Sequence, residues 1–373
     1  MSPADLSVCF VLPSAYGYFT DGVEAAGGGA RQLSFISRAL ADELDVHFVV
    51  GDYGQPAWEV VDGVTLHRAF RSSVETPVWR QPGRLVRLFA AMRRANADVY
   101  LYRGYPFLAT VTYTLARALR AEWIYSLGND SHLTTDIDRL PILFRTLFVR
   151  ALDDAAAIVA QTDVQAEMLR KRFDVPSTVI PSGYPPVEST APHAERKGIL
   201  WVGRLDRQQK RPHLFLDIAD AVPKATFDLV GPDGEEPAYN ERIRSRAAEL
   251  GNVTDHGSVE PDTVHDFYRD AAALVNTSAF EGFPSTFLEA WRYDTPVLSL
   301  SVKPSRYASD AADSGYADKD TEKLAALVRD VAADPSLRVQ LSRPTYEYFQ
   351  EHLTIDSVVD GYRTLLGRIR VDK

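Results

Sequence analysis

Short apolar segments of the kind found in buried strands alternate with helical segments along this chain, and the alternation occurs twice. Helical segments are recognised by apolar residues that recur on one face, as they do between residues 33 and 44. Strands that are separated by helices form parallel sheets with right-handed crossovers. In the first half, the predicted strands are 7–13, 46–50, 64–70, 98–104, 123–128, 157–162 and 177–182.

A proline-rich segment, residues 181–198, interrupts the alternation and is interpreted as a linker. The alternation then resumes with predicted strands at 199–203, 225–231, 252–258, 272–278 and 296–301, and the last 50 or so residues are mostly helical. The sequence therefore predicts two doubly wound α/β domains, residues 1–182 and 183–354, that face each other across a cleft. Ligands of such sheets bind at the carboxyl ends of the strands, so we expect functional residues in strand-to-helix loops.

Composition narrows the functional class. With 373 residues the chain is long enough for two domains, and its net charge of -10 argues against a nucleic-acid binder. No apolar run is long enough to span a membrane, and no signal peptide is visible. The single cysteine, Cys9, lies in a predicted strand and has no partner for an internal disulfide, from which we expect a cytoplasmic location.

Two cations lie in the loop that follows the strand at residues 199–203. Arg204 and Lys210 bracket this loop, and Pro212 is suited to the first turn of the next helix because its missing N–H is not needed there. An arginine and a lysine at one strand end are suited to a diphosphate. The alternative interpretation is an ordinary solvated loop.

Two acids, Glu281 and Glu289, flank the segment that follows the strand at residues 272–278. Pro284 is predicted to begin a helix, which places the N–H groups of residues 285–287 in a first turn that favours an anion. A carboxylate beside a phosphate would be repelled, so both acids are better explained as acceptors of hydrogen bonds from sugar hydroxyls. The alternative for Glu289 is a surface acid of the helix.

Taken in order along the chain, these motifs resemble those of the retaining glycosyltransferases of family 4, which have the GT-B fold. The resemblance includes the pair of motifs "VGRLDRQQKRP" and "EGFPSTFLEAWRYDTPVLS", the second of which carries two acids in an E-x7-E spacing. It extends to "GGGARQLSFISRALADEL", "VIPSGYPP", "DLVGPDG" and "VTDHGSVEPDTVHDFYRDAAALVNTS". The fold that it implies also predicts that the C-terminal helix, residues 355–373, packs back on the N-terminal domain.

The resemblance implies a role for each matching residue. Arg204 and Lys210 would bind the donor diphosphate, Glu281 the donor sugar and Glu289 the nucleotide ribose. Pro284 has no amide to offer, so the backbone contacts to the donor are assigned to neighbouring residues. The remaining implied donor-binding residues are Gly203, Gly231, Gly282, Phe283, Ser285 and Thr286. Gly27, Gly28 and Gly29 would form a loop facing the diphosphate and the acceptor; a bare glycine triplet is otherwise a flexible loop.

The resemblance also implies the chemistry. A nucleotide-diphosphate sugar would donate its sugar to a glycan or lipid-linked acceptor with retention of configuration, in the assembly of a surface glycan or glycoconjugate. In the front-face route, the leaving diphosphate takes the acceptor proton, unlike the double displacement of retaining glycosidases. The cations would stabilise the departing diphosphate, and Glu281 would orient the sugar. We expect no metal and no cofactor besides the donor.

Three departures from the family pattern limit these assignments. A histidine that the family often has near the reacting sugar is Gly128 here, so Asn129, Asp130 or His132 is predicted to take over its role, although His132 is otherwise an ordinary loop histidine. The usual asparagine of the linker motif is Ser182. The segment "VKPSRYASD" stands where the family has two glycines and an acid, so the donor base and sugar are not predicted.

Two basic amphipathic segments, residues 79–96 and 139–152, suggest peripheral contact with an anionic membrane surface. The first contains Arg80, Arg84, Arg87, Arg93 and Arg94 beside apolar residues. Each segment has an equally simple alternative as a crossover helix whose basic face is solvated.

Three other functional classes remain as alternatives. One is a different GT-B enzyme, such as a sugar-nucleotide epimerase or a phosphorylase, and another is a non-catalytic nucleotide-sugar binder. The third is an NAD-dependent enzyme, which is disfavoured because no GxGxxG motif follows the first strand. Product formation distinguishes these classes, since an epimerase needs no acceptor and a binder gives no turnover.

Overall fold

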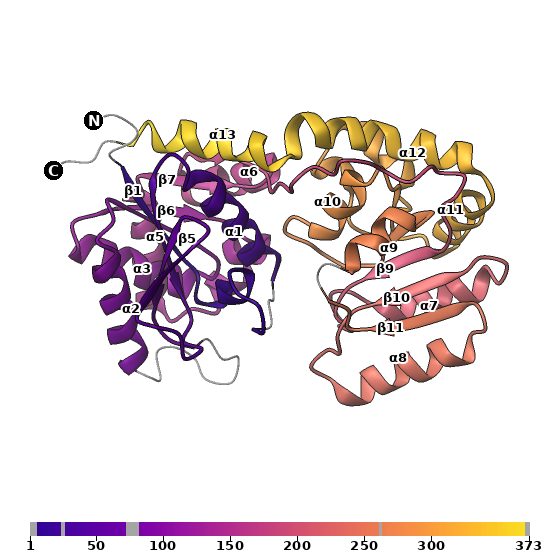
Figure 1. The fold of residues 1–373 in the computed structure, drawn as a ribbon, viewed down its shortest axis with the longest axis horizontal. Coiled ribbons are helices and arrows are strands. Elements are labelled where there is room, and N and C mark those ends of the chain that lie inside the picture. Colours follow the sequence, from indigo (N-terminus) through magenta and orange to yellow (C-terminus); the bar gives the residue numbers. More distant parts are fainter. Residues whose placement is uncertain (1–5, 24–26, 72–81, 261–262, 370–373) are drawn as a thin grey trace. The chain divides into compact units, whose positions relative to one another are not determined.

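The computed structural model describes residues 6–23, 27–71, 82–260 and 263–369. The chain divides into two compact units (Figure 1). Unit 1 comprises Met1–Gly183 together with Ile355–Lys373, and unit 2 comprises Tyr184–Thr354. Each unit contains its own sheet and its own buried core, as the twofold alternation in the sequence predicts.

Unit 1 is built on an eight-stranded sheet with the order β3-β4-β2-β1-β5-β6-β7-β8. From β1 the chain builds outward through β2 and β4, then returns to place β5 on the other side of β1. This reversal makes a topological switch point between β1 and β5. The strands are β1 (Ser7–Val11), β2 (Asp45–Val50), β3 (Trp58–Val61), β4 (Val64–Arg68), β5 (Val99–Arg103), β6 (Glu122–Ser126), β7 (Ala157–Ala160) and β8 (Thr178–Val179).

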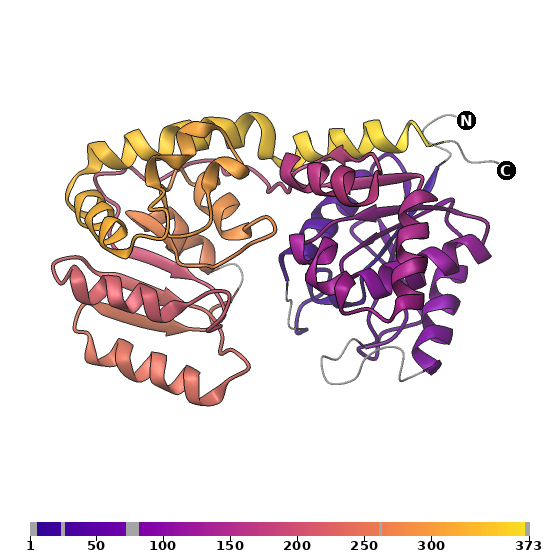
Figure 2. The same ribbon diagram turned by 180° about the vertical axis from the view of Figure 1, so that it is seen from behind.

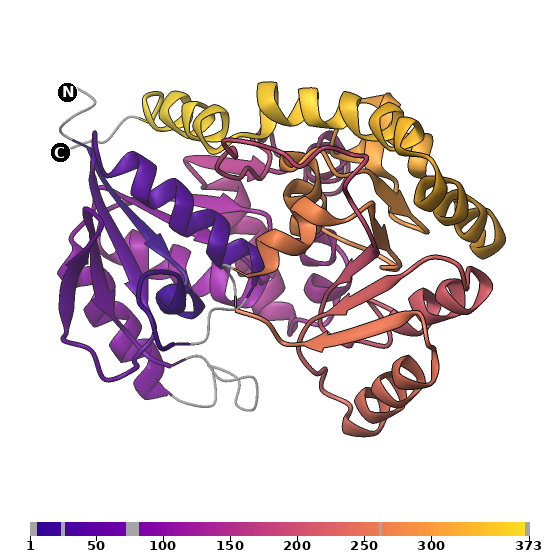
Figure 3. The same cartoon turned by 45° about the vertical axis from the view of Figure 1, so that its right-hand side comes forward.

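Both faces of the sheet are buried at its centre, which explains why β1, β5 and β6 are mostly continuous apolar runs rather than alternating ones. In β1, Val8 and Phe10 face one core, whereas Cys9 and Val11 face the other. The core that contains Cys9 is covered by α2, α3, α5 and α6, and the opposite core by α1 and α13. Figure 2 shows helices α3 and α5 across the near face, and Figure 3 shows α1 on the opposite face.

The helices of unit 1 are α1 (Gly28–Leu40), α2 (Pro82–Ala95), α3 (Pro106–Ala118), α4 (Thr135–Asp138), α5 (Ile142–Asp153), α6 (Asp163–Phe173) and α13 (Ile355–Leu366). The expected return of the C-terminal helix is confirmed, because Val358, Val359 and Tyr362 of α13 are buried in the core that α1 also covers. No helix in the described ranges combines the length and the apolar character needed to cross a bilayer.

One strand of unit 1 is missing from the sequence prediction. β3 pairs antiparallel with β4 at the edge of the sheet, with Val61 opposite Val64. The two residues between them, Asp62 and Gly63, both have positive φ, at 50° and 78°. Asp-Gly is a strong short-range signal for a two-residue hairpin turn, so this dipeptide could have revealed the strand.

Unit 2 is built on a five-stranded parallel sheet with the order β11-β10-β9-β12-β13, which puts its switch point between β9 and β12. Figure 1 shows α7 and α8 beside β9, β10 and β11. The strands are β9 (Ile199–Val202), β10 (Phe227–Val230), β11 (Val253–Gly257), β12 (Ala273–Asn276) and β13 (Val297–Ser299). The helices are α7 (Pro212–Ala221), α8 (Pro237–Glu249), α9 (Val264–Asp270), α10 (Ser285–Arg292), α11 (Thr321–Ala333) and α12 (Pro335–Tyr348).

Candidate active site

The loop between β9 and α7 is folded by the side chain of Asp206. One oxygen of this carboxylate accepts hydrogen bonds from the backbone N–H groups of Gln208 and Gln209, at 2.9 and 2.6 Å. The N–H of Arg211 donates to the Asp206 carbonyl at 2.8 Å. These bonds give the loop a fixed shape and determine where Lys210 is presented.

Lys210 forms an ion pair with Glu281, which lies in the loop between β12 and α10. The distance from Nζ to Oε1 is 2.6 Å, and the side chains are 23% and 8% exposed. Gln209 donates more weakly to the other carboxylate oxygen, at 3.4 Å. The two loops are 71 residues apart in sequence, and they meet because β9 and β12 are adjacent at the switch point. The structure therefore brings together two of the predicted catalytic residues.

Arg211 holds this arrangement in place. Its Nε donates to the carbonyl of Thr277 at 2.7 Å, and its Nη2 donates to the hydroxyl of Ser301 at 2.7 Å. One guanidinium thereby joins the loops that follow β9, β12 and β13. Arg211 has a φ of 51°, a conformation that non-glycine residues rarely adopt, and burial lowers its pKa. Arg211 cannot be distinguished in the sequence from other loop arginines, because only its left-handed backbone and its contacts mark it.

The N-terminus of α10 differs slightly from the prediction. Pro284 is the N-cap residue and the helix begins at Ser285. The N–H of Phe287, which was expected to be available in the first turn, instead bonds to the Pro284 carbonyl at 3.0 Å. The N–H groups of Ser285 and Thr286 point out of the helix end, where no side chain caps them. Within the described residues, the hydroxyl of Thr286 is also buried without a hydrogen-bond partner.

Gly203 follows β9 and Gly231 follows β10, and the backbones of these two adjacent strand ends approach each other closely. Gly231 has a φ of 147°, and a Cβ atom placed on it would lie 1.9 Å from the Gly203 carbonyl oxygen. A Cβ on Gly203 would lie 3.5 Å from Cδ of Lys210. Both positions therefore keep side chains away from the strand ends beside Lys210.

Phe283 and Glu281 are both in contact with Tyr307. The rings of Phe283 and Tyr307 lie 4.9 Å apart between centroids, and the Tyr307 hydroxyl donates to the Glu281 carbonyl at 3.2 Å. Gly282, between them, is buried. Tyr307 belongs to the segment "VKPSRYASD", where the sequence departs from the family pattern and gave no assignment.

The other two predicted donor residues have contrasting environments. Glu289 is 5% exposed, so its alternative interpretation as a surface acid of the helix is wrong. Arg204 is exposed, and its side chain forms no ion pair or hydrogen bond with any described residue. It is therefore free to meet an anion from solvent.

The residues predicted in unit 1 lie around its own switch point. Gly27 is the N-cap of α1 with a φ of 92°, and Gly28 and Gly29 are the first two residues of that helix. No side chain caps this helix end. A Cβ on Gly29 would lie 3.6 Å from Nε of Arg103, the last residue of β5. Arg103 falls within the predicted strand 98–104, and no motif in the sequence indicates a role for it.

Two of the three residues predicted near the reacting sugar are engaged in the local fold. Asn129 caps a short helical turn by accepting from the N–H of Ser131 at 3.1 Å, and Asp130 accepts from Gln165 at 3.0 Å. His132 is 6% exposed and accepts at Nδ1 from the N–H of Gly128, at 3.4 Å. Burial lowers the pKa of His132 to about 4, so at neutral pH this imidazole is uncharged.

The described residues contain no cluster of three or more histidine, cysteine, aspartate or glutamate side chains suited to a metal ion.

Two family models match the chain in tandem. The model for "Glycosyltransferase Family 4" matches residues 26–187, and the model for "Glycosyl transferases group 1" matches residues 196–334. The first match lies within unit 1 except for its last residues, and the second lies within unit 2. The chain belongs to the family 4 glycosyltransferases.

Individual relatives of this family 4 chain match it to different extents. The lipopolysaccharide core biosynthesis glycosyltransferase LpsE of Rhizobium meliloti is 26% identical over 50% of this chain and 51% of its own length. The amylovoran biosynthesis glycosyltransferase AmsD of Erwinia amylovora is 24% identical over 88% of this chain and 92% of its own length. The chain spans about half the length of several of the curated relatives that it matches.

Among solved structures, HepE from Anabaena in complex with UDP and glucose has a TM-score of 0.74 at 15% identity. The match covers 97% of this family 4 chain and 99% of HepE. At this identity the likeness concerns the fold, and the predicted GT-B architecture is confirmed.

Proposed function

We propose that this protein is a retaining glycosyltransferase that moves a sugar from a nucleotide-diphosphate sugar to a glycan or lipid-linked acceptor. The observation that carries the proposal is the ion pair of Lys210 and Glu281 at the switch point of unit 2. The pair places a cation for the diphosphate and a carboxylate for the sugar hydroxyls beside the N-terminus of α10. The diphosphate and the sugar of a donor would therefore have separate partners.

In this proposal the donor diphosphate binds Lys210 and Arg204, together with the free N–H groups at the start of α10. Glu281 accepts hydrogen bonds from the sugar hydroxyls, and Glu289 accepts them from the ribose. The likeness to HepE, which was solved with UDP and glucose, supports a nucleotide-sugar donor. The donor base stays undecided between uridine, guanosine and adenosine.

The chemical step breaks the bond between the anomeric carbon and the diphosphate oxygen, and it forms a bond from the same face to an acceptor oxygen. The acceptor proton passes to the departing diphosphate, which takes the bonding electrons. Lys210 and Arg204 stabilise the negative charge that develops on the leaving group, which is the largest contribution that such a site makes. Glu281 holds the sugar in position.

Surface glycan assembly is the biological setting that the relatives support, since LpsE and AmsD carry names that refer to lipopolysaccharide core and amylovoran biosynthesis. The same names support a glycan or lipid-linked acceptor as part of this proposal. A cytoplasmic location, inferred from the single cysteine, is part of this proposal.

Retention of configuration at the anomeric carbon can be tested with water as the acceptor. Donors with an α-linked sugar are incubated with the enzyme, and the released sugar is followed by proton NMR before it mutarotates. We expect the α anomer to appear first. Initial release of the β anomer would contradict the retaining mechanism, and a product that stays linked to its nucleotide would indicate an epimerase.

The buried hydroxyl of Thr286 gives a test of donor binding that also reports on folding. Thr286→Val keeps the shape of the side chain and removes an unpartnered polar group, so we expect stability to be unchanged or higher by up to about 1 kcal/mol. If the hydroxyl binds the donor, nucleotide affinity falls about 2- to 10-fold. Calorimetric titration with UDP, GDP and ADP measures the affinity, and Thr254→Val on the exposed side of β11 is the control. Lower stability with unaltered affinity would assign the hydroxyl to the fold.

We also propose peripheral contact with an anionic bilayer through α5 and α2. Ile142 and Leu143, at the start of α5, are 84% and 64% exposed, and the exposed Arg145 follows them. Apolar side chains next to arginine are suited to the boundary between headgroups and acyl chains. The apolar face of α2 is engaged differently, because Leu88 and Met92 are buried in the core, so α2 would contribute its arginines and the exposed Val86.

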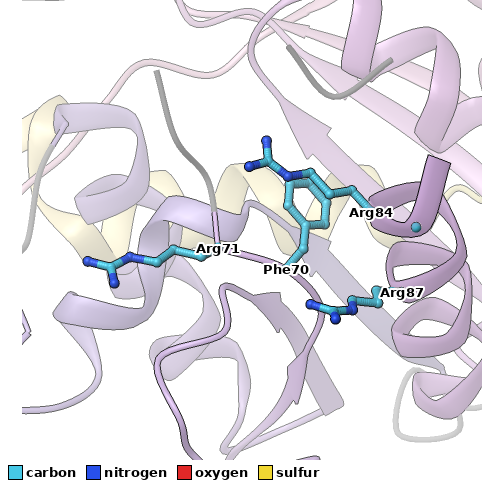
Figure 4. A pocket seen from close by; sticks show the side chains of 5 residues that line it. Phe70, Arg71, Arg84 and Arg87 are labelled. Atoms are coloured by element: carbon cyan, nitrogen blue, oxygen red, sulfur yellow. The ribbon is translucent and has the colours of Figure 1, made fainter. Parts of the chain in front are cut away.

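Arg84 and Arg87 of α2 line a hollow of about 270 Å³ together with Phe70, Arg71 and Gly83. Figure 4 shows Arg84 reaching over the Phe70 ring, with Arg87 extending from the same helix. The Arg84 guanidinium lies 5.8 Å from the Phe70 ring centroid. Such a hollow is suited to an anionic headgroup. Arg80, predicted for the same basic segment, lies outside the described residues.

Replacing both exposed apolar residues tests the contact. Ile142→Asp/Leu143→Asp is expected to lower binding to vesicles of mixed anionic and neutral lipid at least about 10-fold, since each side chain contributes roughly 1.5–3 kcal/mol when buried. Exposed Val339→Asp on α12 is the matched control. Vesicle binding that is unchanged by both the double replacement and added salt would contradict the proposal. So would a wild-type protein that does not bind the vesicles.

A further inference from the structure

Arg103 is a buried cation without an anionic partner. It is 7% exposed, and its Nη2 donates to two neutral side chains, the amide oxygen of Gln161 and the hydroxyl of Ser182, the latter at 3.3 Å. Its Nε–H is buried and has no partner in the described part of the chain. No described carboxylate pairs with it, and burial lowers its pKa. A buried charge left in this state is unfavourable unless something compensates it.

The surroundings of Arg103 offer further hydrogen-bond donors. Gly29 leaves open the space beside the free Nε–H, because even a Cβ atom there would lie 3.6 Å from that nitrogen. No side chain among the described residues caps the N–H groups at the start of α1, those of Gly28 and Gly29. Gln32, one turn along the same helix face, is 1% exposed, and its buried amide nitrogen also has no hydrogen-bond partner among the residues that the structure describes.

The remaining groups orient this cluster and supply no negative charge. The amide oxygen of Gln32 accepts from the N–H of Gly183 at 2.9 Å, next to the Ser182 that contacts Arg103. His132 lies against Gly128 and is uncharged at neutral pH. Two acids near His132 are engaged by other residues, with Asp130 accepting from Gln165 and Asp136 from Ser131. Two buried unpartnered donors and a free helix N-terminus therefore converge at the switch point of unit 1.

We propose that Arg103, with Gln32 and the N-terminus of α1, binds a phosphate group of the acceptor. This inference rests on the proposed glycosyltransferase function, and it specifies the acceptor as a phosphorylated one. A planar guanidinium is suited to phosphate oxygens, and a helix N-terminus adds N–H donors to the same anion. The family resemblance turns the glycine loop of unit 1 toward both the diphosphate and the acceptor; because the donor diphosphate has Lys210 and Arg204 in unit 2, we assign the anion at Arg103 to the acceptor.

The test titrates methyl phosphate into the full chain saturated with the nucleotide that binds best among UDP, GDP and ADP. We expect methyl phosphate to bind with the nucleotide present, and Arg103→Met to weaken that binding at least 10-fold. Nucleotide affinity should stay within twofold of the wild type in this variant. Gly29→Ala serves as a second variant that the surrounding space tolerates, and we expect it to weaken methyl phosphate binding several-fold with an unaltered melting temperature.

The outcomes separate the inference from the function on which it rests. Loss of nucleotide affinity in Arg103→Met, or exclusion of methyl phosphate by the nucleotide, would assign the anion to the donor diphosphate and overturn the proposal. Absence of methyl phosphate binding to a wild type that binds the nucleotide would also overturn it. If no nucleotide binds, the proposed function fails, while phosphate binding that depends on Arg103 would still establish an anion site.

Discussion

Lys210→Met is expected to lower kcat/KM for sugar transfer about 10²- to 10³-fold. Removing one group that stabilises developing charge typically costs about 2.7–4 kcal/mol of transition-state stabilisation. The same change leaves the Glu281 carboxylate, which is 8% exposed, without its cation. We therefore expect a further loss of about 1–3 kcal/mol in folding stability.

A double variant separates the two effects. In Lys210→Met/Glu281→Gln the buried charge is absent, so stability should recover most of the loss while activity stays low. Lys224→Met is the control and should match the wild type. Lys224 is exposed and precedes β10, so it lies at the amino-terminal ends of the strands, opposite the carboxyl ends that carry Lys210. Steady-state kinetics and thermal unfolding measure both quantities. If the double variant regained activity together with stability, Lys210 would be a structural residue.

Gly231→Ala is expected to be the most destabilising single change in unit 2, at about 3 kcal/mol or more. The added Cβ would overlap the Gly203 carbonyl oxygen at 1.9 Å, and a φ of 147° is strained for any residue with a side chain. Because Gly203 lies beside Lys210, any shift that relieves the overlap also displaces the donor site.

Gly251→Ala provides the matched control, since a Cβ there meets nothing within 4 Å. It should change stability by less than about 0.5 kcal/mol. Calorimetric melting of each variant, with and without the donor nucleotide, measures the effect. A Gly231→Ala protein with wild-type melting and wild-type nucleotide affinity would show that the close approach of β9 and β10 is not required.

The central parallel strands of both sheets, such as β1, β5 and β12, were predictable because they are buried on both faces and are therefore continuous apolar runs. β3 was not predicted because it is an exposed edge strand, with Trp58 58% exposed, and therefore is not a continuous buried apolar run. Only the Asp62-Gly63 turn indicates it in the sequence. The C-terminal helix carries an apolar stripe, but its partner in unit 1 follows only from the resemblance to a family fold.

The candidate site was predictable in its residues and less so in its contacts. Lys210 and Glu281 follow from motif positions, whereas their ion pair depends on the adjacency of β9 and β12, which the order of strands in the sequence does not reveal. Arg211 and Arg103 were missed because the sequence does not distinguish an arginine that joins three loops, or one buried without an acid, from an ordinary surface arginine.

Nucleotide release from a panel of UDP-, GDP- and ADP-sugars, with and without lipid-linked acceptors, tests the central claim most directly. The wild type is compared with Glu281→Ala and Arg204→Ala. We predict release from one donor, with a reduction of about 100-fold or more in both variants. Full activity in both variants, or no release from any donor with any acceptor, would contradict the assignment of the donor site to the loops after β9 and β12.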